Sequence, residues 1–315
     1  MRSDAKLLGA GVIAGERVAL SKALSLAEQD GSDYQVLRKE LTDHIVGRIV
    51  LGVTGPPGVG KSSLVNALLQ EWRQDGRRVA VIAVDPSSPI SGGALLGDRV
   101  RMSAALDDAG VYVRSLSSSG HVGGLAPAAV RLIDVFDAAG CDHILLETVG
   151  AGQSEIDIAA VADIKIVVSA PGLGDGIQAM KSGLLEIADV LVVNKSDQPG
   201  ADATAEQLRN AVALRSPDGN EAPVILTSAS RRDGIGVLID QLSRIACCLS
   251  QEDALHRQHR RALYLIEQVA KDLLRNCCSN ADLTAENKAI VTSLAAGEIE
   301  PRDAAHRFLQ QALEP

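Results

Sequence analysis

The chain has 315 residues and a formal net charge of −9, and 46% of its residues are hydrophobic and 23% charged. This balance is typical of a globular protein with one large domain or two modest ones. The acidic excess argues against a general binder of nucleic acid or of anionic lipid, and one Trp, three Tyr and two Phe offer little for a base-stacking platform.

The cysteines and the absence of targeting patterns indicate a cytoplasmic protein. No run of about 18 uncharged apolar residues predicts a membrane span, and residues 1–10 lack the long apolar region of a secretory signal. Four of the five cysteines form two adjacent pairs, which suit neither a zinc site nor a disulfide framework. We therefore expect reduced thiols and no membrane or nucleic-acid partner.

Residues 1–45 are expected to form an N-terminal helical extension. Leu20, Ala23, Leu24 and Ala27 recur at helical spacing, and the polar segment 30–33 interrupts the pattern. We interpret this extension as an arm or cap and not as part of the core.

Residues 46–249 alternate short apolar runs with longer helical segments. The runs are rich in Val and Ile and apolar on both faces, as in the strands of a parallel sheet covered by helices. The expected strands are 49–53, 79–84, 143–146, 164–168, 190–193 and 224–226. This alternation predicts a doubly wound α/β domain with a mostly parallel sheet.

Residues 250–315 contain no strand-like run. An apolar stripe recurs at helical spacing, formed by Leu263, Ile266, Val269, Ala270, Leu273 and Leu274. The stripe could pack on the chain's own α/β domain, but a short helical tail has little core of its own. We favour a helical arm that forms a homodimer.

A phosphate-binding loop follows the first expected strand. It has the form G-x-x-x-x-G-K-S and consists of Gly55, Pro56, Pro57, Gly58, Val59, Gly60, Lys61 and Ser62, with a helix expected over 63–69, from Ser63 on. Glycines let backbone N–H groups approach phosphate oxygens, and a helix N-terminus adds partial positive charge. We expect Lys61 to bridge the β- and γ-phosphates and the Ser62 hydroxyl to bind Mg²⁺.

A guanine-specific motif follows the strand expected at 190–193. Asn194, Lys195, Ser196 and Asp197 have the form N-K-x-D. A carboxylate at Asp197 would accept from both N1–H and the amino group of guanine, groups that adenine lacks, whereas Asn194 would hold the N7/O6 side. After the next strand, Ser228 and Ala229 are expected to direct a backbone N–H at O6. The two motifs predict GTP and GDP as ligands.

Acidic residues end two expected strands where the nucleotide's metal would lie. Asp85 follows 79–84, and Glu147 opens the segment Glu147-Thr148-Val149-Gly150, which resembles the D-x-x-G switch of GTPases. Asp98 lies in a Gly-, Pro- and Ser-rich loop and is a third candidate, for metal coordination or water positioning. Gln153 could orient the attacking water, although its offset from Gly150 is unusual.

Four other residues are expected to have structural roles and not catalytic or metal-binding ones. His256 and His259 are three residues apart without a third ligand nearby, which favours an exposed helix face over a metal site. Cys141 and Trp72 are expected to pack in the core.

Three segments together resemble the methylmalonyl-CoA mutase-associated GTPases, the MeaB/ArgK family. They are VDPSSPISGGALLGDRVRM, ETVGAGQSEIDIA and PGLGDGIQAMKSGLLEIADVLVVNKSD. The resemblance covers roughly residues 8 to 275. It implies a P-loop G domain of the signal-recognition/MinD-like class, homodimerisation through a C-terminal arm, and binding to an adenosylcobalamin-dependent acyl-CoA mutase. GTP hydrolysis would gate delivery of intact cofactor and removal of damaged cofactor.

The resemblance also assigns residues. It places Lys61, Ser62, Asp85, Asp98 and Glu147 at nucleotide and Mg²⁺ positions, Asn194, Lys195 and Asp197 at guanine positions, and 172–181 at a switch that senses the partner. The sequence departs from the family in the loop 117–124, where Ser119 replaces the usual Arg. The loss of a guanidinium there bears on the partner and the activation rate more than on nucleotide binding.

Three alternative functions remain open at the level of sequence. The chain could be a kinase that passes phosphate to an acceptor, a GTP-dependent metallochaperone, or a nucleotide-switched scaffold that does not hydrolyse GTP. The mutase itself is also undetermined, with methylmalonyl-CoA mutase as the default.

Overall fold

The computed structural model describes residues 2–29, 31–85, 108–117, 127–148, 158, 160–172, 183–214, 222–249, 254–279 and 285–313. The chain forms two compact units, Met1–Tyr264 and Leu265–Pro315.

Within the described part of the first unit, seven parallel strands form one sheet in the order β3-β2-β4-β1-β5-β6-β7. The strands are β1 (Val50–Thr54), β2 (Val79–Asp85), β3 (Val111–Ser117), β4 (His143–Thr148), β5 (Ile164–Ser169), β6 (Val190–Val193) and β7 (Val224–Leu226). With β1 at the centre, the chain first adds strands on one side and then on the other. The doubly wound α/β fold predicted from the sequence is therefore confirmed.

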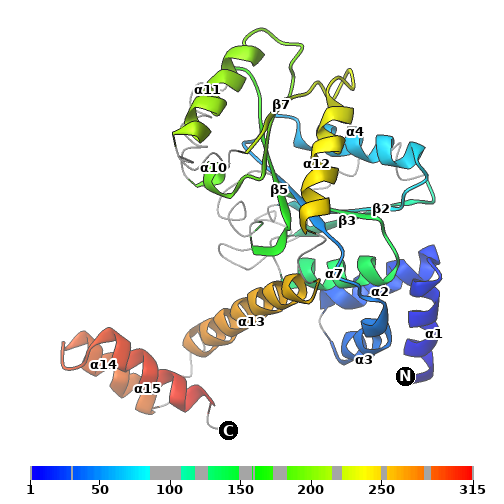
Figure 1. Ribbon diagram of the computed structural model, residues 1–315. Helices are drawn as coiled ribbons and strands as arrows, with labels where there is room; N and C mark the ends of the chain where they lie inside the picture. Colours follow the sequence, from blue (N-terminus) through cyan, green and yellow to red (C-terminus); the bar gives the residue numbers. More distant parts are fainter. Residues whose placement is uncertain are drawn as a thin grey trace. The chain divides into compact units, whose positions relative to one another are not determined.

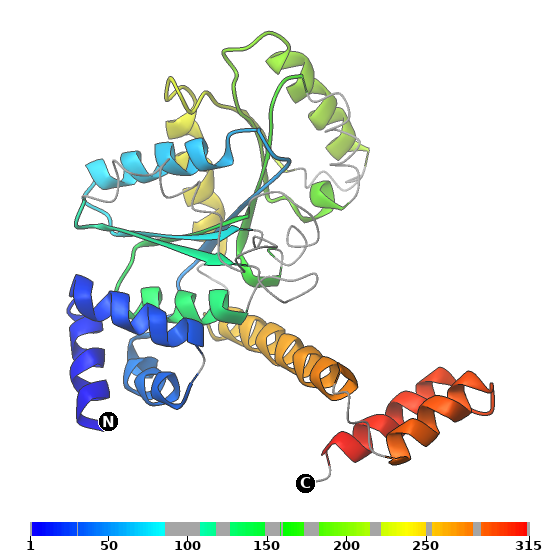
Figure 2. The ribbon, with the colours of Figure 1, turned by 180° about the vertical axis from the view of Figure 1, so that it is seen from behind.

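Helices cover both faces of this sheet (Figures 1 and 2). One face packs on α4 (Lys61–Gln74) and α12 (Ile235–Leu249). The other packs on α7 (Pro127–Ala138) and, further along the sheet, on α10 (Leu184–Ile187) and α11 (Ala201–Ala213). Successive residues of one strand, such as Val50 and Leu51 of β1, belong to opposite apolar layers, which is why the strands are apolar on both faces.

The strand β3 was not predicted from the sequence, whereas the six expected strands are present: two have the expected ends, and the ends of the other four differ by at most two residues. Within the described sheet, β3 pairs with β2 and lies at the edge. Its middle residues Val113, Arg114 and Ser115 are half-exposed. An edge strand needs fewer apolar side chains than a central one, so a search for continuous apolar runs passes over it.

The N-terminal helices share the core of the first unit, so the expectation that they form only an arm or cap was wrong. They are α1 (Arg2–Ile13), α2 (Arg17–Gln29) and α3 (Ser32–Leu41), followed by a short 3₁₀ turn, Thr42–His44. Leu20, Leu37 and Leu41 are almost fully buried in the same apolar layer as Phe136 of α7. Arg131 of α7 donates to the carbonyl of Ala27.

The C-terminal region is helical, as expected. It consists of α13 (Ala254–Ser279), which begins in the first unit and continues into the second, α14 (Ala285–Ala295) and α15 (Pro301–Leu313), the last two packed on each other. Among the helices that the structure describes, we find none with the length and apolar composition that crossing a bilayer requires.

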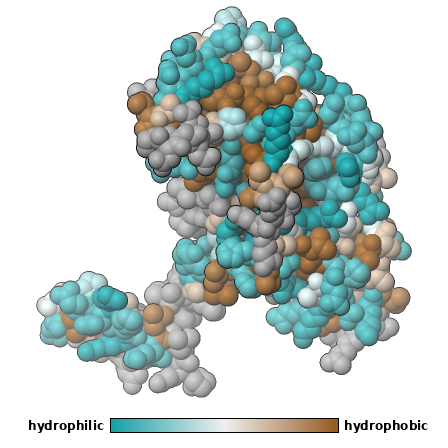
Figure 3. All heavy atoms as spheres, viewed as in Figure 1, coloured by the Kyte–Doolittle hydropathy of each residue, from teal (hydrophilic) through white to brown (hydrophobic). Residues whose placement is uncertain are grey.

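In the view of Figure 3, apolar residues gather between α11 and α12.

Candidate functional site

Three loops and one strand end form the candidate site at the carboxyl edge of the sheet. Residues 55–60 join β1 to α4, residues 194–197 follow β6, and residues 227–234 join β7 to α12, while Glu147 lies near the end of β4. Because the strands are parallel and β1 lies where the strand order reverses, this edge is where a doubly wound fold binds its ligand.

Two glycines of the loop 55–60 have conformations and neighbours that exclude a side chain. Gly55 has φ +141°, and a Cβ there would lie 2.2 Å from the carbonyl oxygen of Val168. Gly60 has φ +90°, and a Cβ there would lie 2.5 Å from Nδ2 of Asn194. The helix α4 begins directly after the loop, at Lys61, two residues earlier than expected. Its first N–H groups therefore face the loop and favour an anion.

The side chains of Lys61 and Ser62 connect the loop to its surroundings. The buried Lys61 donates from Nζ to the carbonyls of Gly55 (2.8 Å) and Pro56 (2.9 Å), which holds the ammonium over the loop. Ser62 Oγ donates to Oε1 of the buried Glu147 at 2.6 Å. A hydroxyl and a carboxylate, the oxygen ligands that Mg²⁺ prefers, thus lie in contact at the start of α4.

Asn194 joins the phosphate loop to the loop after β7. It is buried, and its Nδ2 donates to the carbonyls of Val59 (2.9 Å) and Gly60 (3.3 Å). Its Oδ1 accepts from the backbone N–H of Ala229 (3.1 Å). One amide side chain therefore fixes the three loops relative to one another.

The other residues of the N-K-x-D motif extend over the same loops. Lys195 has φ +58°, and its Nζ donates to the carbonyl of Gly58 at 2.7 Å. Asp197 Oδ1 accepts from Ser228 Oγ at 2.6 Å, and Oδ2 lies 3.9 Å from Nε of Arg231. The hydrogen bond from Ser228, followed by one from the backbone, lowers the pKa of Asp197 from its ordinary 3.8. The carboxylate therefore remains ionised at neutral pH, as a hydrogen-bond acceptor must.

The structure brings together the predicted residues of the loop 55–63, Glu147, Asn194, Lys195, Asp197, Ser228 and Ala229. The N–H of Ala229, which the sequence analysis directed at a base, donates here to Asn194. Asp85 is the last residue of β2, but its side chain lies outside what the structure describes. Asp98, Gly150 and Gln153 lie outside the described residues, as do nearly all of the loop 117–124 and of the segment 172–181.

Two polar contacts of the site were not predicted from the sequence. Thr54 and Thr148, at the ends of the neighbouring strands β1 and β4, are fully buried with their Oγ1 atoms 3.1 Å apart. Ser228 was chosen for its backbone, but its hydroxyl holds Asp197. These contacts could have been suspected from the sequence, because β1 and β4 both end in a threonine and Ser228 closely follows β7.

The residues assigned to structure behave as expected. Cys141 is fully buried, and burial raises the pKa of its thiol to about 12. Trp72 is buried and stacks on His143, with ring centroids 4.1 Å apart. His256 and His259 are exposed. Among the described residues, no three His, Cys, Asp or Glu side chains form a group that could hold a metal ion.

A phosphate loop at the end of β1, a buried Asn194 that joins it to a guanine-type N-K-x-D motif, and a doubly wound parallel sheet together define a P-loop GTPase. The family model for the methylmalonyl Co-A mutase-associated GTPase MeaB matches residues 20–282. The chain belongs to this family.

Comparisons with individual proteins agree with this assignment. A protein of Pyrococcus abyssi named as a GTPase is 38% identical over 304 residues, which cover 95% of this chain and 94% of that protein. GTPase ArgK of Escherichia coli is 33% identical over 299 residues, covering 91% and 90%. The mouse protein named methylmalonic aciduria type A homolog, mitochondrial, is 29% identical over 321 residues, covering 95% and 77%.

A solved structure titled as a LAO/AO transport system kinase has the same fold. It aligns with a TM-score of 0.73 and 23% identity and covers 99% of this chain and 98% of that one. The family model and the relatives named as GTPases identify the protein as a GTPase that binds guanine nucleotides, and this structure agrees in fold.

Proposed function

We propose that this GTPase requires Mg²⁺ and acts as a chaperone for an adenosylcobalamin-dependent acyl-CoA mutase, with methylmalonyl-CoA mutase as the default partner. The nucleotide part of the proposal rests on one observation, the hydrogen bonds of Asn194 to both the phosphate loop and Ala229. The mutase part rests on the family, whose name associates it with methylmalonyl-CoA mutase. Hydrolysis gates the delivery of intact cofactor and the removal of damaged cofactor.

The phosphates bind in the loop from Gly55 to Ser63. Backbone N–H groups of this loop and of the first turn of α4 donate to phosphate oxygens. Lys61, whose ammonium already lies over the loop, neutralises charge on the β- and γ-phosphates. Gly150 offers a further N–H to the γ-phosphate, and Gln153 orients the attacking water.

Ser62 and Glu147 are the first candidates to hold Mg²⁺. Their oxygens are in contact at 2.6 Å, and a hydroxyl and a carboxylate suit this ion, so the residues fit it. Asp85 and Asp98 complete the proposed set. The ion, when bound, neutralises charge that develops on the phosphates during hydrolysis.

The base is recognised by Asp197, with Asn194, Lys195, Ser228 and Ala229 forming the rest of its site. The ionised carboxylate of Asp197 accepts from N1–H and the amino group of guanine. The Lys195 stem, which reaches across to Gly58, lies along the base.

The proposed assembly is a cytoplasmic homodimer formed through the C-terminal helical arm, 250–315. The helix α13 carries Leu263 and Ile266, whose side chains are 67% and 65% exposed. Large apolar side chains at helical spacing and this degree of exposure support burial against a second chain.

The experiment that tests the nucleotide chemistry is a GTP hydrolysis assay on the full chain. Free phosphate should be the product, and Lys61→Ala should lower kcat/KM by at least about 100-fold, because a cation that stabilises transition-state charge is lost. Lys39→Ala, which removes an exposed lysine of α3, is the matched control and should change nothing. Labelled γ-phosphate transferred to an acceptor would contradict hydrolysis and indicate a kinase.

The partner is tested with purified mutases. Methylmalonyl-CoA mutase should bind the chain in a nucleotide-dependent manner and increase its rate of hydrolysis. Binding to isobutyryl-CoA or 2-hydroxyisobutyryl-CoA mutase alone would move the assignment to that enzyme. No response to any of the three would contradict the chaperone role.

A further inference from the structure

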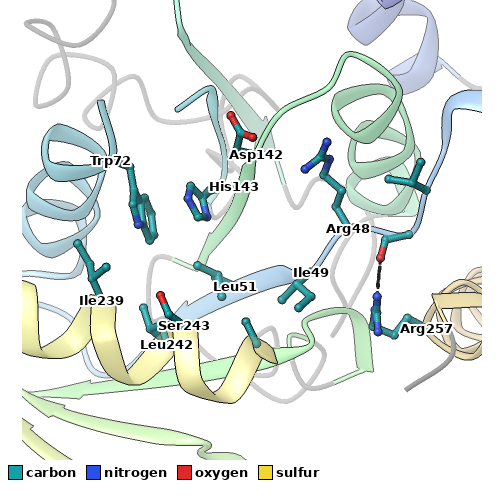
Figure 4. A pocket seen from close by; sticks show the side chains of 13 residues that line it. Arg48, Ile49, Leu51, Trp72, Asp142, His143, Ile239, Leu242, Ser243 and Arg257 are labelled. Carbon is teal, nitrogen blue, oxygen red and sulfur yellow. Dashed lines mark hydrogen bonds between the residues drawn. The ribbon is translucent and has the colours of Figure 1, made fainter. Parts of the chain in front are cut away.

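A pocket of about 350 Å³ opens at the other edge of the sheet, at the amino ends of β1 and β4. Its lining comes from the entry to β1 (46–51), the start of β4 (142–143), Trp72 of α4, one side of α12 and Arg257 of α13 (Figure 4). The elements β1, α4, β4 and α12 also border the nucleotide site at their other ends. The pocket is therefore separate from that site.

The floor and one wall of the pocket are apolar or aromatic. Ile49 and Leu51 of the β1 segment face Leu242 of α12 across the pocket, and the stacked rings of Trp72 and His143 form a wall (Figure 4). Burial lowers the pKa of His143 to about 4, so its ring is neutral at physiological pH and adds planar surface without charge. This lining suits an apolar body.

Arg48 is the polar group that a ligand could bind. Within the described residues, its Nε is buried without a hydrogen-bond partner. The Nε lies 3.8 Å from Oδ1 of Asp137, which is longer than a hydrogen bond. Oδ2 of Asp137 accepts from the backbone N–H groups of Gly47 (2.8 Å) and Arg48 (2.9 Å). The side chain of Arg48 as a whole is 35% exposed, and it lines the pocket.

The charges around the pocket favour an anion. Two guanidinium groups, those of Arg48 and Arg257, and one carboxylate, that of Asp142, line the pocket. Oδ2 of Asp142 accepts from the N–H of Arg78 at 2.8 Å, and Oδ1 lies 3.7 Å from the guanidinium of Arg77. The buried Arg257, which donates to the carbonyls of Gly47 and Leu249, adds a second positive charge. Figure 4 shows the Arg48 guanidinium on the same side of the pocket as His143, opposite the side chains of α12.

We propose that this pocket is a second ligand site and that it binds a small carboxylate with an apolar body. A planar carboxylate matches the hydrogen-bond donors of the Arg48 guanidinium. The apolar body lies on Ile49, Leu51 and Leu242 beside the Trp72–His143 wall. The volume lies at the small end of the range for ligand sites, which limits the ligand to a compact molecule.

The emission of Trp72 tests the proposal, because the chain has one Trp and it lines the pocket. We would titrate the full chain with phenylacetate and with the matched neutral and cationic probes phenylethanol and phenethylamine. Phenylacetate should change the emission saturably, with a Kd on the order of 1 mM for so small a ligand. The alcohol and the amine should bind at least about tenfold more weakly, because they lack the charge that Arg48 recognises.

Two pairs of variants locate the binding. Ser243 lines the pocket from an exposed position on α12, so Ser243→Phe should abolish the phenylacetate titration, whereas Cys248→Phe, exposed on the same helix outside the pocket, should leave it unchanged. Arg48→Gln should weaken phenylacetate about tenfold, and Arg48→Lys should recover part of the loss. Retained GDP binding shows that each variant is folded. Equal binding of all three probes, an unaltered titration in Ser243→Phe, or no saturable change would overturn the proposal.

Discussion

Asp197 is held at the surface by the hydroxyl of Ser228, and this contact is the first cause of its lowered pKa. Asp197→Asn should weaken GDP binding by at least about 100-fold, because two charge-assisted hydrogen bonds to the base are lost. It should at the same time improve the relative affinity for XDP, whose C2 oxygen can accept from the new amide. Competition of GDP and XDP for a fluorescent nucleotide measures both.

The same residue predicts how nucleotide binding depends on pH. A carboxyl whose pKa is lowered stays ionised as the pH falls through the ordinary range of aspartate. The preference for GDP over inosine diphosphate, which lacks the amino group that Asp197 would bind, should therefore be constant between about pH 5 and pH 8, because neither base titrates in this range. A preference that changes within this window would mean that Asp197 is not the group that reads the base.

The residues of the site could be predicted from sequence where a motif is contiguous, and not where distant segments meet. Lys61 and Asp197 belong to such motifs, and their neighbours in the chain identify them. The hydrogen bonds of Asn194 to Val59 and Ala229 link positions 135 and 35 residues away, so only the fold could reveal them. For the same reason the pairing of Thr54 with Thr148 was missed.

At the scale of elements, the central strands could be predicted and the polar joints between elements could not. Because β1 and β5 are buried on both faces, they are nearly continuous apolar runs, which can be recognised directly in the sequence. The N-terminal part of α13 is instead attached to the sheet by ion pairs. Arg260 and Arg261 both bind the buried carboxylate of Asp163, which also accepts from the N–H of Val50 at 2.8 Å. Nothing in the local sequence of these residues indicates that they meet.

Asp163→Asn should lower the free energy of unfolding by about 3–5 kcal/mol, because it leaves the guanidinium of Arg261 buried without its carboxylate. Burial already lowers the pKa of Arg261, which indicates how unfavourable the charge is there. Urea unfolding followed by the emission of Trp72 measures the change in the first unit.

Asp189→Asn is the matched control for this element. Asp189 also accepts from a backbone N–H and pairs with a cation, both of Lys165, but its side chain is 33% exposed. An exposed pair contributes little, so the loss should stay below about 1 kcal/mol. Equal losses of unfolding free energy for Asp163→Asn and Asp189→Asn would show that burial of the ion pair is not what stabilises the N-terminal part of α13.

At the scale of the whole molecule, His143 makes stability depend on pH. The pKa of its imidazole is lowered from 6.5 to about 4 because burial disfavours the charged ring. The unfolded chain therefore takes up a proton first, and stability is lost as the pH falls from about 6.5 towards 4. His143→Phe, which preserves a ring beside Trp72, should lose less stability over this window.

Urea unfolding of the wild type and the variant at pH 7 and pH 5 measures the difference. His44→Phe, which changes an exposed histidine, should retain the wild-type response. Parallel loss in wild type and His143→Phe would assign the pH dependence to other groups.

The proposed dimer is a second property of the whole molecule. Ile266→Glu should convert the dimer to a monomer, because a charge at the centre of an apolar contact is costly to bury. Light scattering on the eluted protein should show half the wild-type mass, and GDP binding should be retained. Gln268→Glu, which introduces the same charged residue in place of a polar one at another position around α13, is expected to remain dimeric. A monomer mass for the wild-type chain in the same measurement would contradict the proposed dimer.

Asn194 and Asp197 lie three residues apart, yet the protein divides their tasks. The amide nitrogen and the amide oxygen of Asn194 are both hydrogen-bonded to the surrounding loops. Asp197, in contrast, is an exposed residue whose carboxylate accepts from the hydroxyl of Ser228. In the proposed site, a substitution at Asp197 should therefore change the base preference while the arrangement of the three loops is retained. Loss of Asn194 should instead displace the phosphate loop and the proposed base site together, so a change of nucleotide specificity is expected to begin at Asp197 and not at Asn194.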